Sequence, residues 1–201
     1  MKVLLISPPT ITPVKEVLDI ANPPLGLGYL ASVARQKGHD VKIIEAIGEN
    51  LTFDDIKRKV LQYDPDVVGI TATTAMIPDA YLVAKVAKEN NPNLTVVIGG
   101  PHVTFLPEYT FHECPYIDII VRGEGEVTFS ELLDAIEKGK PFRNILGISY
   151  RDYDGSIKST PSRPLIKNVD SIPMPAFDLF NWDAYKFNEY RYGTIITSRG
   201  C

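Results

Sequence analysis

The chain has 201 residues, of which 44% are hydrophobic and 23% are charged, and its formal net charge is −4. This composition is typical of a globular protein with a real core and argues against intrinsic disorder. A net acidic chain without a basic block also argues against nucleic-acid binding. Two distant cysteines, Cys114 and Cys201, exclude a disulfide scaffold.

The amino-terminal residues resemble a buried strand more than a targeting signal. The apolar run Val3–Ile6 stops at Pro8-Pro9, which makes it too short for the hydrophobic region of a secretion signal. No apolar run reaches the roughly 18–20 residues that a membrane span requires. We therefore expect a cytoplasmic protein with no membrane partner.

Strands and helices are predicted to alternate along the first part of the chain. Continuous apolar runs predict strands at Val3–Ile6, Val41–Glu45, Val67–Thr71, Thr95–Ile98 and Asp118–Val121. Helical spacing and end signals predict helices at Leu25–Gln36, from Thr52 to about Gln62, from Pro78 to Asn90, around Leu106–His112 and at Val127–Glu137. Such alternation predicts an α/β, doubly wound, parallel five-stranded sheet, flavodoxin-like or Rossmann-like, in the order 2-1-3-4-5.

The pattern changes after Lys140. Asp154-Gly155 between two strand-like runs predicts a β-hairpin extension over residues 141–160. Four prolines within 161–183 indicate a Pro-rich linker, which we assign to residues 161–191. Residues 192–197 again look like a strand. The predicted units are therefore 1–140, 141–160, 161–191 and 192–201.

Ligands bind at the carboxyl ends of the strands in a doubly wound sheet, so the loops after the strands are the candidate site. These loops are rich in glycine, which permits close backbone approach, and in threonine, which can hydrogen-bond a polar ligand. The glycine and threonine residues of any one loop could simply end a strand. Because all of these loops are expected at one edge of the sheet, together they favour a ligand site. The candidates are Ser7, Pro8, Pro9, Thr71, Thr73, Thr74, Gly99, Gly100, Pro101, His102, Gly123, Glu124 and Gly125.

Several familiar sites are excluded. The sequence contains no P-loop motif, and Gly26-x-Gly28 is only a weak match to a dinucleotide fingerprint because the third glycine is missing. A phospho-receiver domain would carry acids at the ends of its first and third strands. The chain has Ser7-Pro8-Pro9 and Thr71-Ala72-Thr73 there instead.

Single titratable residues give weaker signals. Of the three histidines, only His102 is expected at the ligand edge, where a loop-stabilising role is somewhat favoured over a ligand or acid–base role. Helix-dipole stabilisation explains at least one of Glu124 and Glu126. Glu124, which lies between two glycines, is the better functional candidate. Cys114 is expected to be a small buried residue.

The order of these motifs resembles one protein family. Five segments in this order resemble the amino-terminal cobalamin-binding domain of cobalamin-dependent radical S-adenosylmethionine proteins. They are Val3–Pro9, Pro24–Ala31, Asp66–Thr71, Gly99–His102 and Gly123–Glu126. Asp170–Leu179 resembles the linker before their radical domain, and Ser198–Cys201 resembles the start of their cluster loop. The resemblance implies cobalamin as cofactor. In a full-length parent it further implies a [4Fe–4S] cluster and S-adenosylmethionine, used for methyl transfer or related radical chemistry.

The resemblance also implies roles for individual residues. Cys201 would be one cluster ligand, incomplete on its own, so this chain is expected to be a fragment that binds cobalamin without catalysis. The missing radical domain would be its partner, and 161–183 would pack on that domain. Because Pro8–Pro24 contains no histidine, cobalt is expected to receive no ligand from that loop.

The cobalamin contacts are likewise implied by the resemblance. The corrin ring would lie against Pro8, Pro9, Leu25 and Tyr29, while Thr71, Thr73 and Thr74 would bond the nucleotide tail or corrin amides. Gly99, Gly100 and Gly123 would allow close backbone contact. The remaining expected contacts are Ser7, Gly26, Pro101, His102, Glu124 and Gly125. A bulky residue at Gly100 or Gly123 is expected to abolish binding and leave the fold intact.

Two alternatives remain open. The absence of the lower-ligand histidine is compatible with a degenerate docking domain that has lost cobalamin. The Thr71–Thr74 loop could instead hold a phosphate in a flavin- or nucleotide-binding module, since fold alone does not decide function.

Overall fold

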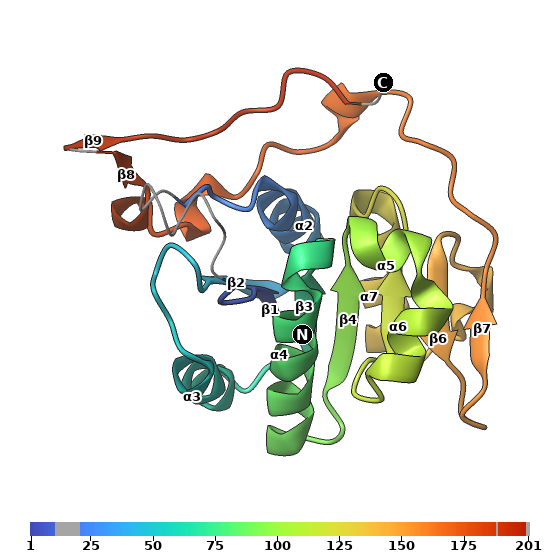
Figure 1. Ribbon diagram of the computed structural model, residues 1–201. Coiled ribbons are helices and arrows are strands. Elements are labelled where there is room, and N and C mark those ends of the chain that lie inside the picture. Colours follow the sequence, from blue (N-terminus) through green and yellow to red (C-terminus); the bar gives the residue numbers. More distant parts are fainter. Residues whose placement is uncertain (11–20, 188, 200–201) are drawn as a thin grey trace.

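The sheet of the protein is predominantly parallel and has helices on both faces. A computed structural model describes residues 1–10, 21–187 and 189–199, and within these residues seven strands form one sheet in the order β2-β1-β3-β4-β5-β6-β7 (Figure 1). Its strands are β1 (Lys2–Ser7), β2 (Asp40–Glu45), β3 (Val67–Thr71), β4 (Thr95–Gly99), β5 (Ile119–Val121), β6 (Ile148–Arg151) and β7 (Ile157–Ser159). The first five are parallel and have the predicted order 2-1-3-4-5, which confirms the fold class.

Helices cover both faces of the sheet. They are α2 (Leu25–Gln36), α3 (Phe53–Tyr63), α4 (Ile77–Asn90), α5 (Pro101–Phe105), α6 (Pro107–Glu113) and α7 (Glu126–Glu137), with short 3-10 turns η1 (Thr74–Met76) and η2 (Phe142–Asn144). Helices α2 and α7 lie on one face and α3 to α6 on the other. Val3 and Leu5 of β1 pack in the core formed with α2 and α7. Leu4 and Ile6 pack in the core formed with α3 and α4. Because successive strand residues point to opposite faces, one apolar run supplies both cores.

Local signals account for the helix ends. The Thr52 hydroxyl accepts a hydrogen bond from the Asp55 amide, and the Asp55 carboxylate accepts one from the Thr52 amide, which together form a capping box at the predicted start of this helix. The side-chain hydrogen bond from Thr52 is the main cause that lowers the pKa of Asp55 to about 2. The helix predicted around Leu106–His112 is α6, and the structure adds the short helix α5 before it; a proline lies in the first turn of each.

The predicted hairpin is present, and it extends the main sheet. Strand β6 pairs antiparallel with β5, and β7 pairs with β6. The partly buried Arg122 guanidinium donates to the carbonyls of Ile148 and Thr160, and so links the end of β5 to the hairpin. Its burial lowers the pKa of Arg122. The hairpin thus protects the β5 edge, which would otherwise be open.

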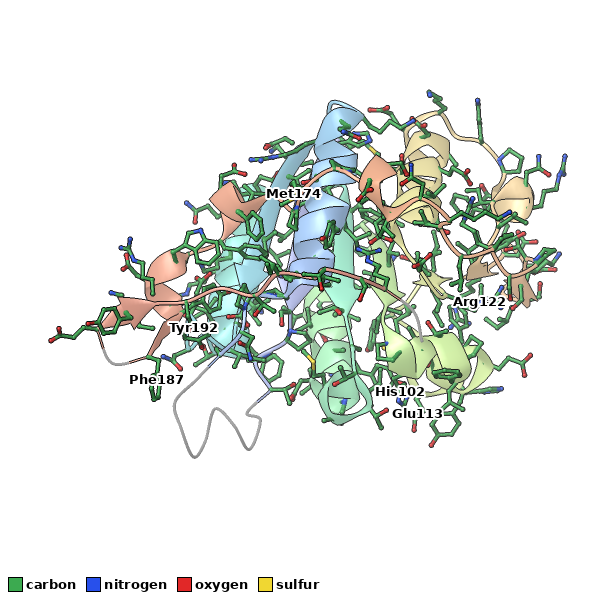
Figure 2. All side chains as sticks on the ribbon, turned by 90° about the horizontal axis from the view of Figure 1, so that it is seen from above. His102, Glu113, Arg122, Met174, Phe187 and Tyr192 are labelled. Atoms are coloured by element: carbon green, nitrogen blue, oxygen red, sulfur yellow. The ribbon has the colours of Figure 1, made fainter. Side chains whose placement is uncertain are left out.

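Residues 161–199, here named the strap, return across the carboxyl edge of the sheet. The strap holds η3 (Val169–Ser171), η4 (Phe177–Leu179), η5 (Trp182–Ala184) and a two-stranded ribbon of β8 (Lys186–Phe187) and β9 (Tyr190–Arg191). Figure 2 looks down on this edge and shows the strap passing over α2. Residues 192–199 are not in a strand, so the strand predicted at 192–197 is wrong.

Part of the strap packs on this domain, although we expected it to pack on another. The Ala176 amide donates to the Gly28 carbonyl at 3.0 Å, and Ser32 donates to the Met174 carbonyl at 2.5 Å. A Cβ at Gly28 would lie 3.0 Å from the Cβ of Pro175, so the glycine permits this close approach. The discounted Gly26-x-Gly28 pair therefore has a packing role at its second glycine.

A small aromatic core joins the strap to the β2 side of the sheet. Tyr185 is fully buried, and its hydroxyl donates to Glu45 Oε2 at 3.3 Å. The same carboxylate accepts the amides of Ile47 at 3.1 Å and Gly48 at 2.6 Å. Burial raises the pKa values of both Glu45 and Tyr185. Trp182 and Phe180 pack edge-on around Tyr185 and complete the cluster.

Candidate functional site

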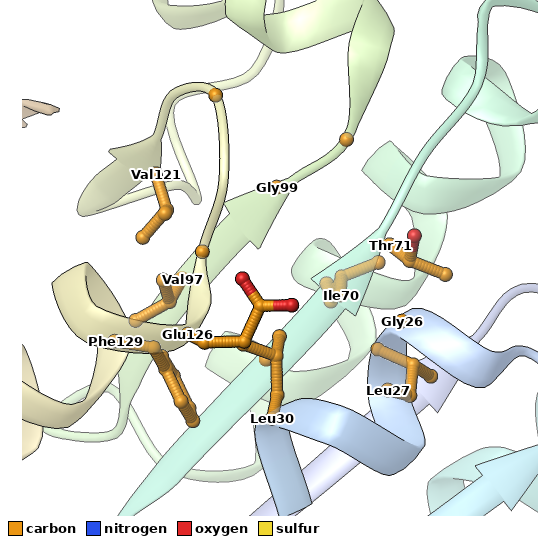
Figure 3. A pocket seen from close by; sticks show the side chains of 14 residues that line it. Gly26, Leu27, Leu30, Ile70, Thr71, Val97, Gly99, Val121, Glu126 and Phe129 are labelled. Atoms are coloured by element: carbon orange, nitrogen blue, oxygen red, sulfur yellow. The ribbon is translucent and has the colours of Figure 1, made fainter. Parts of the chain in front are cut away.

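A pocket opens at the carboxyl edge of the sheet, between the first turns of α2 and α7 and above β3, β4 and β5. Its volume is about 180 Å³ (Figure 3). The wall is mainly backbone and aliphatic or aromatic side chains. The lining residues are Gly26, Leu27, Leu30, Gly69, Ile70, Thr71, Val97, Gly99, Gly100, Val121, Gly123, Gly125, Glu126 and Phe129. Such an apolar concavity with few polar groups is the usual form of a small-molecule site.

Glycines keep the rim of the pocket free of side chains. Gly26 and Gly123 have no heavy atom within 4 Å of where a Cβ would stand. Gly100 instead lies close to the loop that follows β3. A Cβ added at Gly100 would lie 2.4 Å from the Ala72 carbonyl oxygen. A substitution at Gly100 would therefore disturb the fold, and the expectation that it leaves the fold intact is wrong.

Glu126 is the one acid in the lining. Its residue is 6% exposed, and Figure 3 shows the carboxylate pointing into the space between Leu30, Val97 and Phe129. Arg199 of the strap lies 2.5 Å from Glu126 Oε1 through its Nη1 atom. The Arg199 guanidinium also lies over the Tyr29 ring at 4.6 Å. Within the described residues Glu126 Oε2 is buried without a hydrogen-bond partner.

A second polar group lies on the α4 and α5 side of the same edge. Thr10 donates to Asp79 at 2.6 Å, and His102 Nδ1 lies 3.3 Å from the Thr74 hydroxyl. His102 is 8% exposed, and its Nε2 has no partner among the described residues. It does not line the pocket. Its contact with Thr74 is the loop-stabilising role favoured from the sequence.

The sequence-predicted residues divide into two groups. Six of them line the pocket: Gly26, Thr71, Gly99, Gly100, Gly123 and Gly125. Ser7 and Pro8 are buried at the end of β1, Pro9 is partly buried, and Leu25 is buried in α2. Tyr29 lies under Arg199, exposed Thr73 precedes η1, and Pro101 begins α5. Cys201 and residues 11–20 of the Pro8–Pro24 loop lie outside the described residues.

The sequence favoured Glu124 over Glu126 as the functional candidate, whereas the structure places Glu126 in the pocket. Glu124 accepts the Ile166 amide at 2.6 Å, so it holds the strap and does not line the pocket. Glu126, which helix-dipole stabilisation would explain from the sequence, has its carboxylate inside the pocket. The apolar wall residues Leu27, Leu30 and Phe129 lie in the helices predicted at Leu25–Gln36 and Val127–Glu137. Their helical spacing could not show that they also border a cavity.

In the described part of the chain, every helix is too short or too polar to span a membrane. No group of three or more His, Cys, Asp or Glu side chains is arranged to hold a metal ion within the ranges 1–10, 21–187 and 189–199.

The chain is similar in sequence to known proteins that are longer than it is. An uncharacterized methyltransferase of Pyrococcus horikoshii is 55% identical over 201 residues, which cover 100% of this chain and 43% of that protein. An anaerobic magnesium-protoporphyrin IX monomethyl ester cyclase of Rubrivivax gelatinosus is 36% identical over 89% of this chain and 33% of its own length. The chain thus spans less than half the length of these relatives.

A solved structure gives the same fold. The apo structure of the cobalamin-dependent S-adenosylmethionine radical enzyme OxsB superposes with a TM-score of 0.77 and 24% identity, over 100% of this chain and 27% of that one. The family model of the B12 binding domain matches residues 12–133, more than half of the chain. This chain is therefore a member of the B12-binding domain family, related to cobalamin-dependent radical S-adenosylmethionine enzymes.

Proposed function

We propose that this domain binds cobalamin with the heteroaromatic base of its nucleotide tail in the pocket and the corrin ring over the carboxyl edge. The observation that carries the proposal is the size and chemistry of the pocket. An apolar cavity of roughly 150 Å³ holds a benzene molecule. The pocket of about 180 Å³ therefore suits a small aromatic base and is too small for a corrin ring.

The residues around the mouth fit this arrangement. Bare backbone at Gly26 and Gly123 lets a large ring system approach the edge closely. Pro8, Pro9 and Tyr29 would flank the corrin, and the hydroxyls of Thr71, Thr73 and Thr74 would bond its amides or the tail. The remaining residues proposed to contact cobalamin, or to hold those that do, are Ser7, Leu25, Gly99, Gly100, Pro101, His102, Glu124 and Gly125.

The apolar walls of the pocket suit the uncharged, flat part of a ligand. A phosphate, whether of a flavin mononucleotide or of the nucleotide tail of cobalamin, would lie outside the pocket. The pocket alone therefore does not separate these ligands, and the binding test below does.

For the whole protein we propose a radical S-adenosylmethionine enzyme of the methyltransferase type. Bound cobalamin would supply a methyl carrier, and this chain would position and shield it. Residues 1–140 would be the cobalamin domain, 141–160 its hairpin and 161–191 the linker. Residues 192–201 would begin the radical domain, where Cys201 would be one ligand of a [4Fe–4S] cluster used with S-adenosylmethionine. The names of the relatives support this assignment.

The test compares cobalamin retention by the wild-type chain and by a variant with a filled pocket. In Gly26→Leu the new side chain enters open space on a helix, so α2 should keep or gain stability. Lys57→Leu, at an exposed position of α3, is the matched control. After incubation with hydroxocobalamin and size-exclusion chromatography, we expect colour to co-elute with the wild type and the control.

We expect Gly26→Leu to lose at least about tenfold in affinity, since its side chain fills the base pocket. Equal binding by Gly26→Leu would mean that the pocket is not the binding site. Absence of cobalamin from the wild-type peak would overturn the proposal and favour a docking domain. Tight binding of a flavin in its place would favour the flavin alternative.

A further inference from the structure

We infer that Glu126 recognises the ring nitrogen of the base that enters the pocket, and that the complex holds one proton between this carboxylate and that nitrogen. The inference rests on the proposed function and deepens it, because it states what kind of base the site selects. The ligand class is a heteroaromatic base of the imidazole type whose ring nitrogen is free to take a proton.

The first observation is an unsatisfied acceptor inside an apolar cavity. Glu126 is 6% exposed, and its Oε2 atom has no partner within the described residues. Around it the wall is formed by Leu30, Val97 and Phe129 (Figure 3). A buried carboxylate oxygen without a donor is costly, so native sites normally supply one. A ligand that brings a donor into the pocket would satisfy it.

The second observation is the charge arrangement around Glu126. Arg199 from the strap contacts only Oε1, at 2.5 Å, and it also covers the Tyr29 ring of α2. Glu124, two residues away, is turned to the Ile166 amide. Apart from Glu126, the polar side chain in the lining is Thr71. Arg199 therefore pairs with Oε1 and leaves Oε2 for a donor from the ligand.

The chemistry of the base follows from this geometry. A neutral imidazole-type ring presents a lone pair at its free nitrogen, and this lone pair would repel a carboxylate oxygen. When the nitrogen takes a proton from solvent, the same position becomes an N–H donor and a charge-assisted hydrogen bond forms. One proton is taken up per ligand bound, and one N–H bond is made. A nitrogen that remained bound to cobalt could not take part, so the site selects the form of cobalamin with its base detached.

The test measures how cobalamin affinity depends on pH. For the wild type, the dissociation constant should rise by up to tenfold per pH unit between pH 6 and 8.5, because each binding event takes up about one proton. Cobinamide, which lacks the base, should bind with no such slope. Calorimetry in two buffers of different ionisation enthalpy should give close to one proton for cobalamin and none for cobinamide.

Variants separate recognition from a structural role. In Glu126→Gln the side-chain amide can donate to a neutral ring nitrogen, so cobalamin should still bind but without the pH slope or the proton uptake. Glu131→Gln, farther along α7, should keep the wild-type slope. A wild type whose affinity is independent of pH, or a Glu126→Gln variant with an unchanged slope, would overturn the inference and leave cobalamin binding intact. Loss of binding by the wild type at every pH would instead overturn the proposed function.

Discussion

At this edge of the sheet, we expect an added methyl group to lower the free energy of unfolding most at Gly100. Its φ of +117° disfavours any L side chain, and its Cβ would lie 2.4 Å from the Ala72 carbonyl oxygen. Backbone strain of this kind costs about 1–3 kcal/mol. Forcing an extra carbon into a packed region typically adds about 1–3 kcal/mol. We expect Gly100→Ala to lower the free energy of unfolding by about 3 kcal/mol.

The assay is thermal and urea unfolding followed by circular dichroism. At about 2–4 °C per kcal/mol for a chain of this size, Gly100→Ala should lower Tm by about 6–12 °C. The matched control is Gly26→Ala on the same edge, where nothing lies within 4 Å of the added Cβ. Its helical position should raise stability by about 0.5–1 kcal/mol. A Gly100→Ala variant as stable as the wild type would refute the steric reasoning.

Two further variants test other parts of the structure. Burial is the main cause that lowers the pKa of His39 below 6.5. The folded state therefore binds fewer protons than the unfolded state below pH 6.5. The free energy of unfolding should be fully present above pH 6.5 and should decrease as the pH falls toward the lowered pKa of His39, by at most about 1.4 kcal/mol per pH unit. Urea unfolding at pH 5.5 and 7.5 should show this loss in the wild type and little of it in His39→Gln; equal losses would contradict the assignment. Gly28→Leu should displace the strap at Pro175 and Phe180, whose atoms lie 3.0 and 3.1 Å from the added Cβ. We expect protease cleavage within 161–191 to accelerate several-fold over Gly26→Ala, and an unchanged rate would mean that this contact does not hold the strap.

The sheet was predictable because its signals are local. Apolar runs such as Val3–Ile6 are buried on both faces, and a parallel sheet with right-handed crossovers leaves few possible strand orders. Helix α2 has the predicted bounds, since Pro24 precedes it and Gly38 at φ +83° follows it. The capping box of α3 was equally readable from Thr52 and Asp55.

The site was only partly predictable because it depends on distant contacts. The glycine-rich loops indicated the edge at which the pocket opens, and six of the predicted residues line it. Sequence spacing could not show which of Glu124 and Glu126 points inward, since the Ile166 amide that engages Glu124 comes from the strap. The strand predicted at 192–197 failed for a related reason: β-propensity produces a strand only where a neighbouring strand is available to pair. Whether the predicted residues contact cobalamin stays a prediction.

The contact between Tyr185 and Glu45 limits where the chain can be truncated without disturbing this domain. The two residues are 140 positions apart, yet the tyrosine is fully buried and its hydroxyl donates to the carboxylate of the last residue of β2. An excised piece ending at residue 160 would expose Ile43 and Ile47 and leave Glu45 without this donor. The packing of this domain therefore extends beyond the five alternating strands into the strap. Expression boundaries for the domain belong after residue 192, because Tyr192 also bonds the Ala21 carbonyl that leads into α2.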